Sequence, residues 1–257
     1  PPKFRNFSRR RFMKSSNYAR ALSGVFLAGL IFVAQLGHAS AVPLETCQTS
    51  TALSLNMGLM RGHLLVAAEL FEAGHYELAQ RHSKHPAEEV YQELRPALSR
   101  LELPGFAPEL SAFAETLAEG AGGREQFTGR YAVLMRTMDA LEAQLPLANQ
   151  QQRLVAFELV KQAAYEYSVG VTKDGLVIDM QEYQDAYGFV TVAKSKLAGD
   201  SPSETEQLDQ DVSEYLNAAM DLWPTLMPEA PLQVGSQRLN PLLSAMTQAG
   251  MSEKTCN

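Results

Sequence analysis

Cysteine is scarce in this sequence, which contains only Cys47 and Cys256. The chain therefore has no C-x-x-C redox motif and no C-x-x-C-H haem attachment site. It also lacks the G-x-S-x-G elbow of hydrolases, the H-E-x-x-H motif of zinc proteases, the P-loop and the dinucleotide fingerprint. None of these common catalytic signatures is present, so the sequence favours a protein that is not an enzyme.

Basic residues are also few, and they are unevenly placed. The whole chain has 22 Lys and Arg against 29 Asp and Glu. Seven of the basic residues lie within residues 1–41, which contain no acid, so the remaining residues carry a net charge of −14. Nucleic acids and anionic membrane surfaces are bound through basic patches, so this charge argues against both as partners.

Residues 1–41 have the order of an export signal. The basic stretch SRRRFMK at 8–14 precedes an apolar run at 21–36 and the small residues Ala39 and Ala41. The pair of arginines followed by Phe12 predicts the twin-arginine route to the periplasm. The apolar run is shorter than the ~20 residues of a membrane span, so we expect no stable span once the signal is removed.

The two cysteines lie near the two ends of residues 42–257, the segment that we expect to form the exported domain. In an oxidising compartment they can pair, and a bridge between Cys47 and Cys256 would hold the first and last helices together. We therefore predict this disulfide.

Glycine and proline recur at helix-length intervals, whereas β-branched residues rarely cluster. These patterns predict an all-α protein, a helical bundle. The expected helices cover about 51–73, 76–84, 86–101, 108–119, 125–144, 149–170, 179–197, 201–223 and 241–248. Residues 50–145 and 149–255 each begin with a long helix followed by one that contains tyrosine. This pattern suggests two similar halves but does not by itself establish a repeat.

Histidine is confined to one short part of the expected exported domain. His63, His75, His82 and His85 fall within 23 residues, and none follows. We expect a helix that stops at Gly74 to let the next helix fold back, so that His63 faces the region of His75 and His82. The metal-ligand candidates are therefore the four histidines with two nearby acids: His63, His75, His82, His85, Glu72 and Glu89.

Imidazole and carboxylate groups suit iron, copper or zinc, and facing helices of bundles can hold such ions. A structural interpretation also fits, because histidines near helix ends and acids such as Glu89 in a first helical turn are common without a metal. Gly188 lies within an expected helix, where glycine costs about 1 kcal/mol relative to alanine, so close helix packing is expected at that position.

The stretch YEYSVGVTKDGLVIDMQEYQDAYGFVTVA, residues 165–193, resembles a segment of the extracytoplasmic helical domain of bacterial iron permeases of the FTR1 type. The matching positions are Tyr167, Asp174, Gly175, Glu182, Tyr183 and Phe189. The chain lacks the R-E-x-x-E motif of those permeases, so transport activity is not implied. The resemblance implies a helical module that handles iron or another metal.

The sequence as a whole leads to two functional hypotheses. The first is a periplasmic, non-catalytic protein that binds or delivers a transition metal, with iron favoured, to an envelope transporter or another metal-handling protein. The second is a helical interaction module of the cell envelope that binds no metal.

Overall fold

The computed structural model describes residues 43–85, 90–198, 206–233, 235, 237–253 and 256. The chain divides after Ser40, and all described residues belong to the second unit, 41–257. The predicted export signal, residues 1–41, and the predicted helix start at Pro86 lie outside the described residues.

The all-α prediction is confirmed for the described residues, in which the only β-type pairing is an isolated bridge between Val171 and Val177. The helices are α1 (Leu44–Glu72), α2 (Tyr76–His85), α3 (Tyr91–Arg100), α4 (Ala107–Ala118), α5 (Arg124–Glu142), α6 (Asn149–Gly170), α7 (Met180–Leu197), α8 (Glu206–Met220) and α9 (Asn240–Gln248). A short 3₁₀ turn, Gly120–Gly123, joins α4 to α5.

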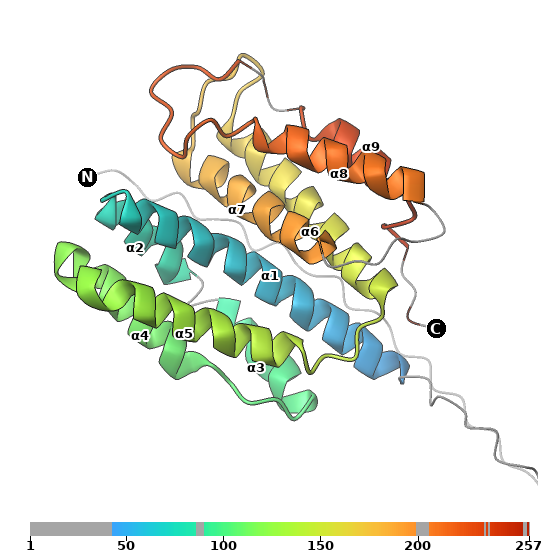
Figure 1. Cartoon of the computed structure of the whole chain (residues 1–257), viewed down its shortest axis with the longest axis horizontal. Helices are drawn as coiled ribbons and strands as arrows, with labels where there is room; N and C mark the ends of the chain where they lie inside the picture. Colours follow the sequence, from blue (N-terminus) through green and yellow to red (C-terminus); the bar gives the residue numbers. More distant parts are fainter. Residues whose placement is uncertain are drawn as a thin grey trace, which may run out of the picture. The chain divides into compact units, whose positions relative to one another are not determined.

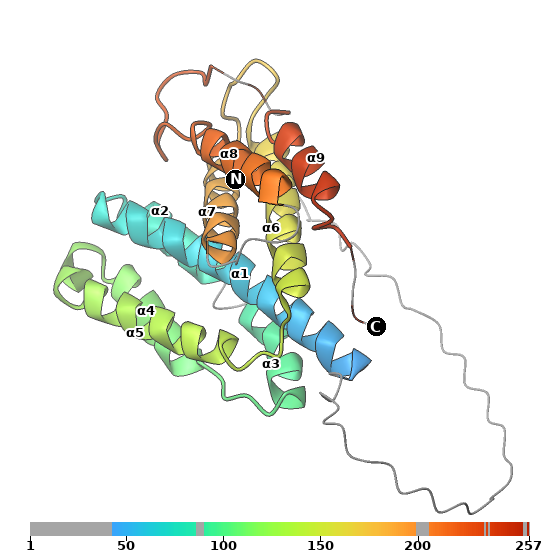
Figure 2. The same cartoon turned by 45° about the vertical axis from the view of Figure 1, so that its right-hand side comes forward.

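The long helix α1 occupies the middle of this unit (Figure 1). Helices α4 and α5 lie on one side of it, and α6 and α7 lie on the other (Figure 2). Helix α7 packs against both α6 and α1, and α8 and α9 pack against each other beyond this pair. As a result, α7 lies between the early helix α1 and the later helices α6 and α8.

The turn after α1 reverses the chain, as the sequence predicted. Gly74 adopts a φ of +86°, which favours glycine because it has no β-carbon. The backbone N–H of Gly74 donates to the carbonyl of Phe71, and that of His75 donates to the carbonyl of Leu70. These two bonds satisfy carbonyls at the end of α1 in a Schellman arrangement, and α2 then packs back along α1.

One helix start differs from the prediction. Helix α1 begins at Leu44, directly after Pro43, rather than at about Thr51. The N–H of Cys47 in its first turn donates to the carbonyl of Pro43. Pro96 lies inside α3, which ends at Arg100, close to the predicted end at 101, and Leu94 and Leu98 bury the same face on both sides of the proline.

Two hydrophobic clusters divide the unit near the connection between α5 and α6. One contains buried side chains from Leu53 to Leu145, and the other contains buried side chains from Val155 to Met251. Leu55 and Leu59 of α1 pack against the second cluster, and Tyr187 of α7 packs against both. The two clusters therefore meet where α1 and α7 pack together.

Helices α1 and α7 cross at two glycines. A β-carbon added to Gly188 would lie 2.4 Å from the carbonyl oxygen of Gly62, and one added to Gly62 would lie 2.5 Å from the ring of Phe189. The close packing expected at Gly188 is thus present. It brings His63, the residue after Gly62, against α7.

The predicted disulfide between Cys47 and Cys256 is present, with their Cα atoms 5.8 Å apart. It joins the first turn of α1 to the segment that follows α9. The bridge closes a loop of 209 residues, which removes conformational entropy from the unfolded chain.

We expect Gly188→Ala to lower the thermal midpoint strongly, because its β-carbon would overlap the backbone of Gly62 and overpacking typically costs 1–3 kcal/mol. The matched control is Gly129→Ala in α5, where a β-carbon would meet no atom within 4 Å. That change should stabilise the protein by up to about 1 kcal/mol through helix propensity. Thermal melts followed by circular dichroism measure both, and equal shifts would contradict the close crossing.

Candidate metal centre

Three buried side chains from three helices meet beside the glycine crossing. His63 comes from α1, His82 from α2 and Asp185 from α7, and they are 8%, 1% and 3% exposed. Each position follows from a local feature. The crossing of α1 and α7 places His63 beside α7. The chain reversal at Gly74 folds α2 back along α1, so that His82 lies beside His63 and Asp185.

Asp185 shares one carboxylate oxygen between both imidazoles. Nδ1 of His63 lies 2.6 Å from Oδ1 of Asp185, and Nδ1 of His82 lies 2.9 Å from the same oxygen. The edge of the His63 ring meets Phe189 with a centroid distance of 5.1 Å. Phe189 thus covers one side of the group with apolar surface.

Gln184 fixes the orientation of His82. The Gln184 amide nitrogen donates to the carbonyl of Leu226 at 2.8 Å, so its Oε1 faces Nε2 of His82 at 2.7 Å. An amide oxygen only accepts, and Nε2 must therefore carry a hydrogen. His82 consequently faces Asp185 with Nδ1. Metal-binding histidines typically have this arrangement, in which one ring nitrogen faces the metal and a supporting residue holds the other.

The charge of Asp185 is stabilised by its neighbours. Burial alone would raise the pKa of this carboxyl group, but the charges and hydrogen bonds of His63 and His82 outweigh burial and hold its pKa well below its usual range. Asp185 is therefore an ionised carboxylate inside the protein. A buried carboxylate that loses its partners is costly, commonly by 3–5 kcal/mol.

The donor set fits a transition metal. One nitrogen from each histidine and one Asp185 oxygen all lie within 4.8 Å of one another. Two imidazoles and one carboxylate suit iron, zinc or copper, and three protein ligands leave coordination positions open for water or for a ligand from another molecule. A cation bound at the Nδ1 atoms would take the place of the protons that these atoms share with Asp185.

A small cavity borders the group. It has a volume of about 240 Å³ and is lined by residues of α2 and of the segment that enters α7: Leu78, Arg81, His82, Ile178, Asp179, Met180, Gln181 and Gln184. His82 and Gln184 form its buried end, since both are almost fully inaccessible. The cavity thus approaches the group from the side of His82, and neither His63 nor Asp185 lines it.

Only some of the predicted metal ligands lie together in the structure. It places His63 and His82 together, whereas His75 and Glu72 are exposed at the turn after α1 and do not belong to the group. His75 precedes the first residue of α2, outside the helix that carries His82. The side chain of His85 and the whole of Glu89 lie outside the described residues.

The sequence interpretation missed Asp185 and Gln184. In this stretch the sequence analysis expected close packing at Gly188. Tyr183 and Tyr187 also pack there, since their rings are buried or half-buried and their hydroxyl groups donate to Thr225 and Glu69. A signal was present, since Gln184 and Asp185 are polar residues within the apolar pattern of α7. No sequence pattern, however, predicted that these residues contact His63 of α1 and His82 of α2.

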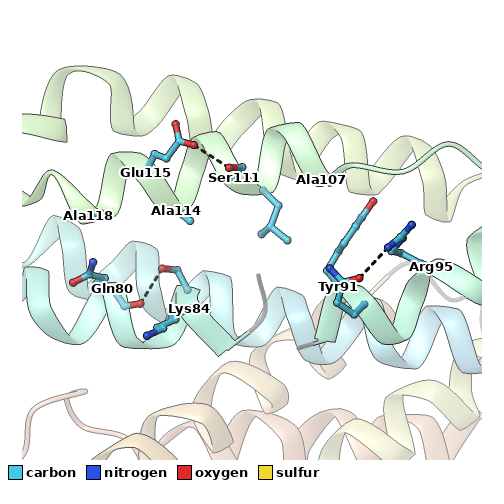
Figure 3. Close-up of a pocket in the computed structure, with 12 residues that line it drawn as sticks. Gln80, Lys84, Tyr91, Arg95, Ala107, Ser111, Ala114, Glu115 and Ala118 are labelled. Carbon is cyan, nitrogen blue, oxygen red and sulfur yellow. Dashed lines mark hydrogen bonds between the residues drawn. The ribbon is translucent and has the colours of Figure 1, made fainter. Parts of the chain in front are cut away.

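A larger cavity, of about 710 Å³, lies between α4 and the pair α2 and α3 (Figure 3). Lys84 and Arg95 line it on one side, and Ser111 and Glu115, which bond to each other, line it on the other. Among the described residues, its lining contains no histidine, cysteine or aspartate. This cavity is therefore separate from the candidate metal centre.

A pair of carboxyl groups lies next to the candidate metal centre, between α6 and α7. Burial, a hydrogen bond with Glu166 and the charges of Glu166, Asp185 and Asp179 together raise the pKa of Glu182 to about 8. Gln162 donates a hydrogen bond to Glu166. Near neutral pH, Glu182 therefore keeps the proton that it shares with Glu166 in their hydrogen bond.

Comparison with known proteins supports the predicted resemblance. Residues 147–248, from the start of α6 to the end of α9, match the family model of the iron permease-associated 4-helix bundle domain. The match covers less than half of the chain and includes Asp185 but neither histidine. No curated protein and no solved structure matches the chain. Among the described helices, none is both long and apolar enough to cross a membrane.

The carboxyl pair predicts how stability depends on pH. Between its ordinary pKa of 4.5 and about 8, Glu182 keeps a proton in the folded protein that the unfolded chain has lost, so the free energy of unfolding falls as pH rises through this window. Glu182→Gln removes this effect. Its thermal midpoint should exceed that of the wild type by a few degrees at pH 8, with a much smaller difference at pH 5.

The matched control is Glu214→Gln on the exposed face of α8, which should behave like the wild type at both pH values. An equal gain for Glu182→Gln at pH 5 and pH 8 would contradict the shared proton.

Proposed function

We propose that this protein binds a transition-metal ion at His63, His82 and Asp185 and acts as a non-catalytic metal-binding or metal-delivery module. The observation that carries the proposal is the convergence of two imidazoles and a carboxylate from three helices on one buried point. Iron is favoured over copper and zinc because residues 147–248 match a domain associated with iron permeases.

The arrangement supports exchangeable binding more than permanent storage. Three protein ligands leave coordination positions open, and the 240 Å³ cavity leads to His82 from the surface. A delivery protein needs both features, since the receiving molecule must reach the ion. We propose that the receiver is an envelope transporter, and that the chain works in the periplasm after export by the twin-arginine route.

The competing function is an interaction module without metal. The hydrogen bonds from His63 and His82 already satisfy Asp185, which favours this alternative. Joining α1, α2 and α7 would be a sufficient role for these contacts without any metal. The two functions differ in whether the metal content of the protein depends on His63, His82 and Asp185. Variants at these positions therefore distinguish them.

We expect the purified chain to bind one Fe²⁺ or Zn²⁺ ion, and Asp185→Asn to weaken that binding by at least about 100-fold. Loss of supporting residues alone commonly costs 10–100-fold, and Asp185 is the proposed anionic ligand itself. His82→Gln should have a similar effect with little change in side-chain volume. Isothermal titration calorimetry and elemental analysis measure affinity and stoichiometry.

The matched control is His75→Ala, which removes an exposed histidine outside the group and should leave affinity unchanged. Circular dichroism confirms that each variant is folded. Equal metal content in the wild type, Asp185→Asn and His82→Gln would refute the metal centre and support the interaction module.

A further inference from the structure

Exposed apolar side chains gather at the connection between α6 and α7. Of the large hydrophobic residues that are exposed in the described chain, four come from residues 165–178: Tyr165 at 52%, Val169 at 39%, Leu176 at 49% and Ile178 at 67%. Burying such side chains is worth about 1.5–3 kcal/mol each, so their joint exposure indicates a surface that a partner covers. We call these four residues the apolar patch.

The patch is held by a rigid turn. The N–H of Ile178 donates to the carbonyl of Gly170, and that of Thr172 donates to the carbonyl of Leu176. Leu176 and Ile178 alternate with the partly buried Val177, so both point away from the core. Val169 directly precedes Gly170, so α6 continues the apolar surface.

A second segment fixes the turn from behind. Gly175 adopts a φ of +80° and exchanges contacts with Leu232, whose N–H donates to its carbonyl at 2.8 Å. Figures 1 and 2 both show this connection beside the segment that follows α8. The exposed side chains are thus presented by a braced backbone, and a preorganised surface loses less entropy when it binds.

The patch also borders the route to the candidate metal centre. Ile178, its most exposed member, lines the cavity that ends at His82 and Gln184. A protein that covered Ile178 would therefore lie over the mouth of that cavity. This is the position from which a receiving protein could take an ion.

Acidic groups surround the patch. Asp174 and Asp179 are exposed on either side of Leu176 and Ile178, and Glu166 and Glu182 lie between α6 and α7. Within the described chain, neither of these glutamates forms an ion pair with a basic side chain. Because Glu182 keeps its proton near neutral pH, the negative charge of this rim comes mainly from Asp174, Asp179 and Glu166. Lys173 in the same turn and Arg81 at the cavity offset part of it.

We infer that the apolar patch and its acidic rim are the surface on which a membrane transporter docks, through an apolar side chain flanked by Lys or Arg on the transporter's extracytoplasmic face. This inference rests on the proposed delivery function, and it names the partner surface. Charge complementarity selects the partner and speeds encounter, while the apolar contact supplies the affinity. The docked transporter covers the cavity that leads to His82.

The test uses a photo-crosslinking amino acid at Ile178 in the full chain, expressed in its native host. The control position is Val133, an exposed apolar residue of α5. We expect Ile178 to crosslink several-fold more than Val133 to one integral membrane protein. Mass spectrometry should identify that protein as a metal transporter and place Lys or Arg beside the crosslinked residue.

Two further variants separate this inference from the metal centre. Leu176→Asp should reduce the Ile178 crosslink several-fold without changing metal affinity in vitro. Asp185→Asn should lose metal but keep the crosslink. If Ile178 crosslinks no more than Val133, or crosslinks only to a second copy of this chain, the docking surface is refuted, whatever the metal measurements show.

Discussion

The carboxylate of Asp185 is the point on which the arrangement of the bundle depends. One of its oxygens accepts hydrogen bonds from His63 of α1 and His82 of α2, while its backbone belongs to α7. Helix α7 lies more than 100 residues after α1 and α2 in the sequence, and the two hydrophobic clusters meet where α1 and α7 pack. An ionised group in such a place is stable only with both partners present, so the same contacts position the helices and the ligands.

The glycine crossing makes this contact attainable. Gly62 and Gly188 allow the backbones of α1 and α7 to approach so closely that a β-carbon at Gly188 would overlap the backbone of Gly62. His63 lies one residue beyond that approach, and Asp185 lies about one turn before it. Gln184 then ties His82 to the segment that follows α8 through Leu226. The candidate centre is therefore held by hydrogen bonds among α1, α2, α7 and the segment that follows α8.

Local signals in the sequence predicted most of the fold. The turn at Gly74, the range of α6 and the helix expected at 179–197 all agree with the structure, because each depends on residues close in sequence. In that last helix, Asp179 is the N-cap of α7. The disulfide was also predictable, since a chain with two cysteines has only one possible pairing. The His63–His82 neighbourhood followed from the hairpin of α1 and α2. Asp185 could not be predicted as their partner, because its contact spans more than 100 residues and has no motif.

The most direct test of the metal centre is a crystal structure of the chain loaded with Fe²⁺ or Zn²⁺, with anomalous diffraction measured at the absorption edge of the metal. The account predicts a single strong anomalous peak bonded to one nitrogen of His63, Nδ1 of His82 and a carboxylate oxygen of Asp185. A peak elsewhere, such as at the exposed His75, with His63 and His82 still hydrogen-bonded to Asp185, would contradict it.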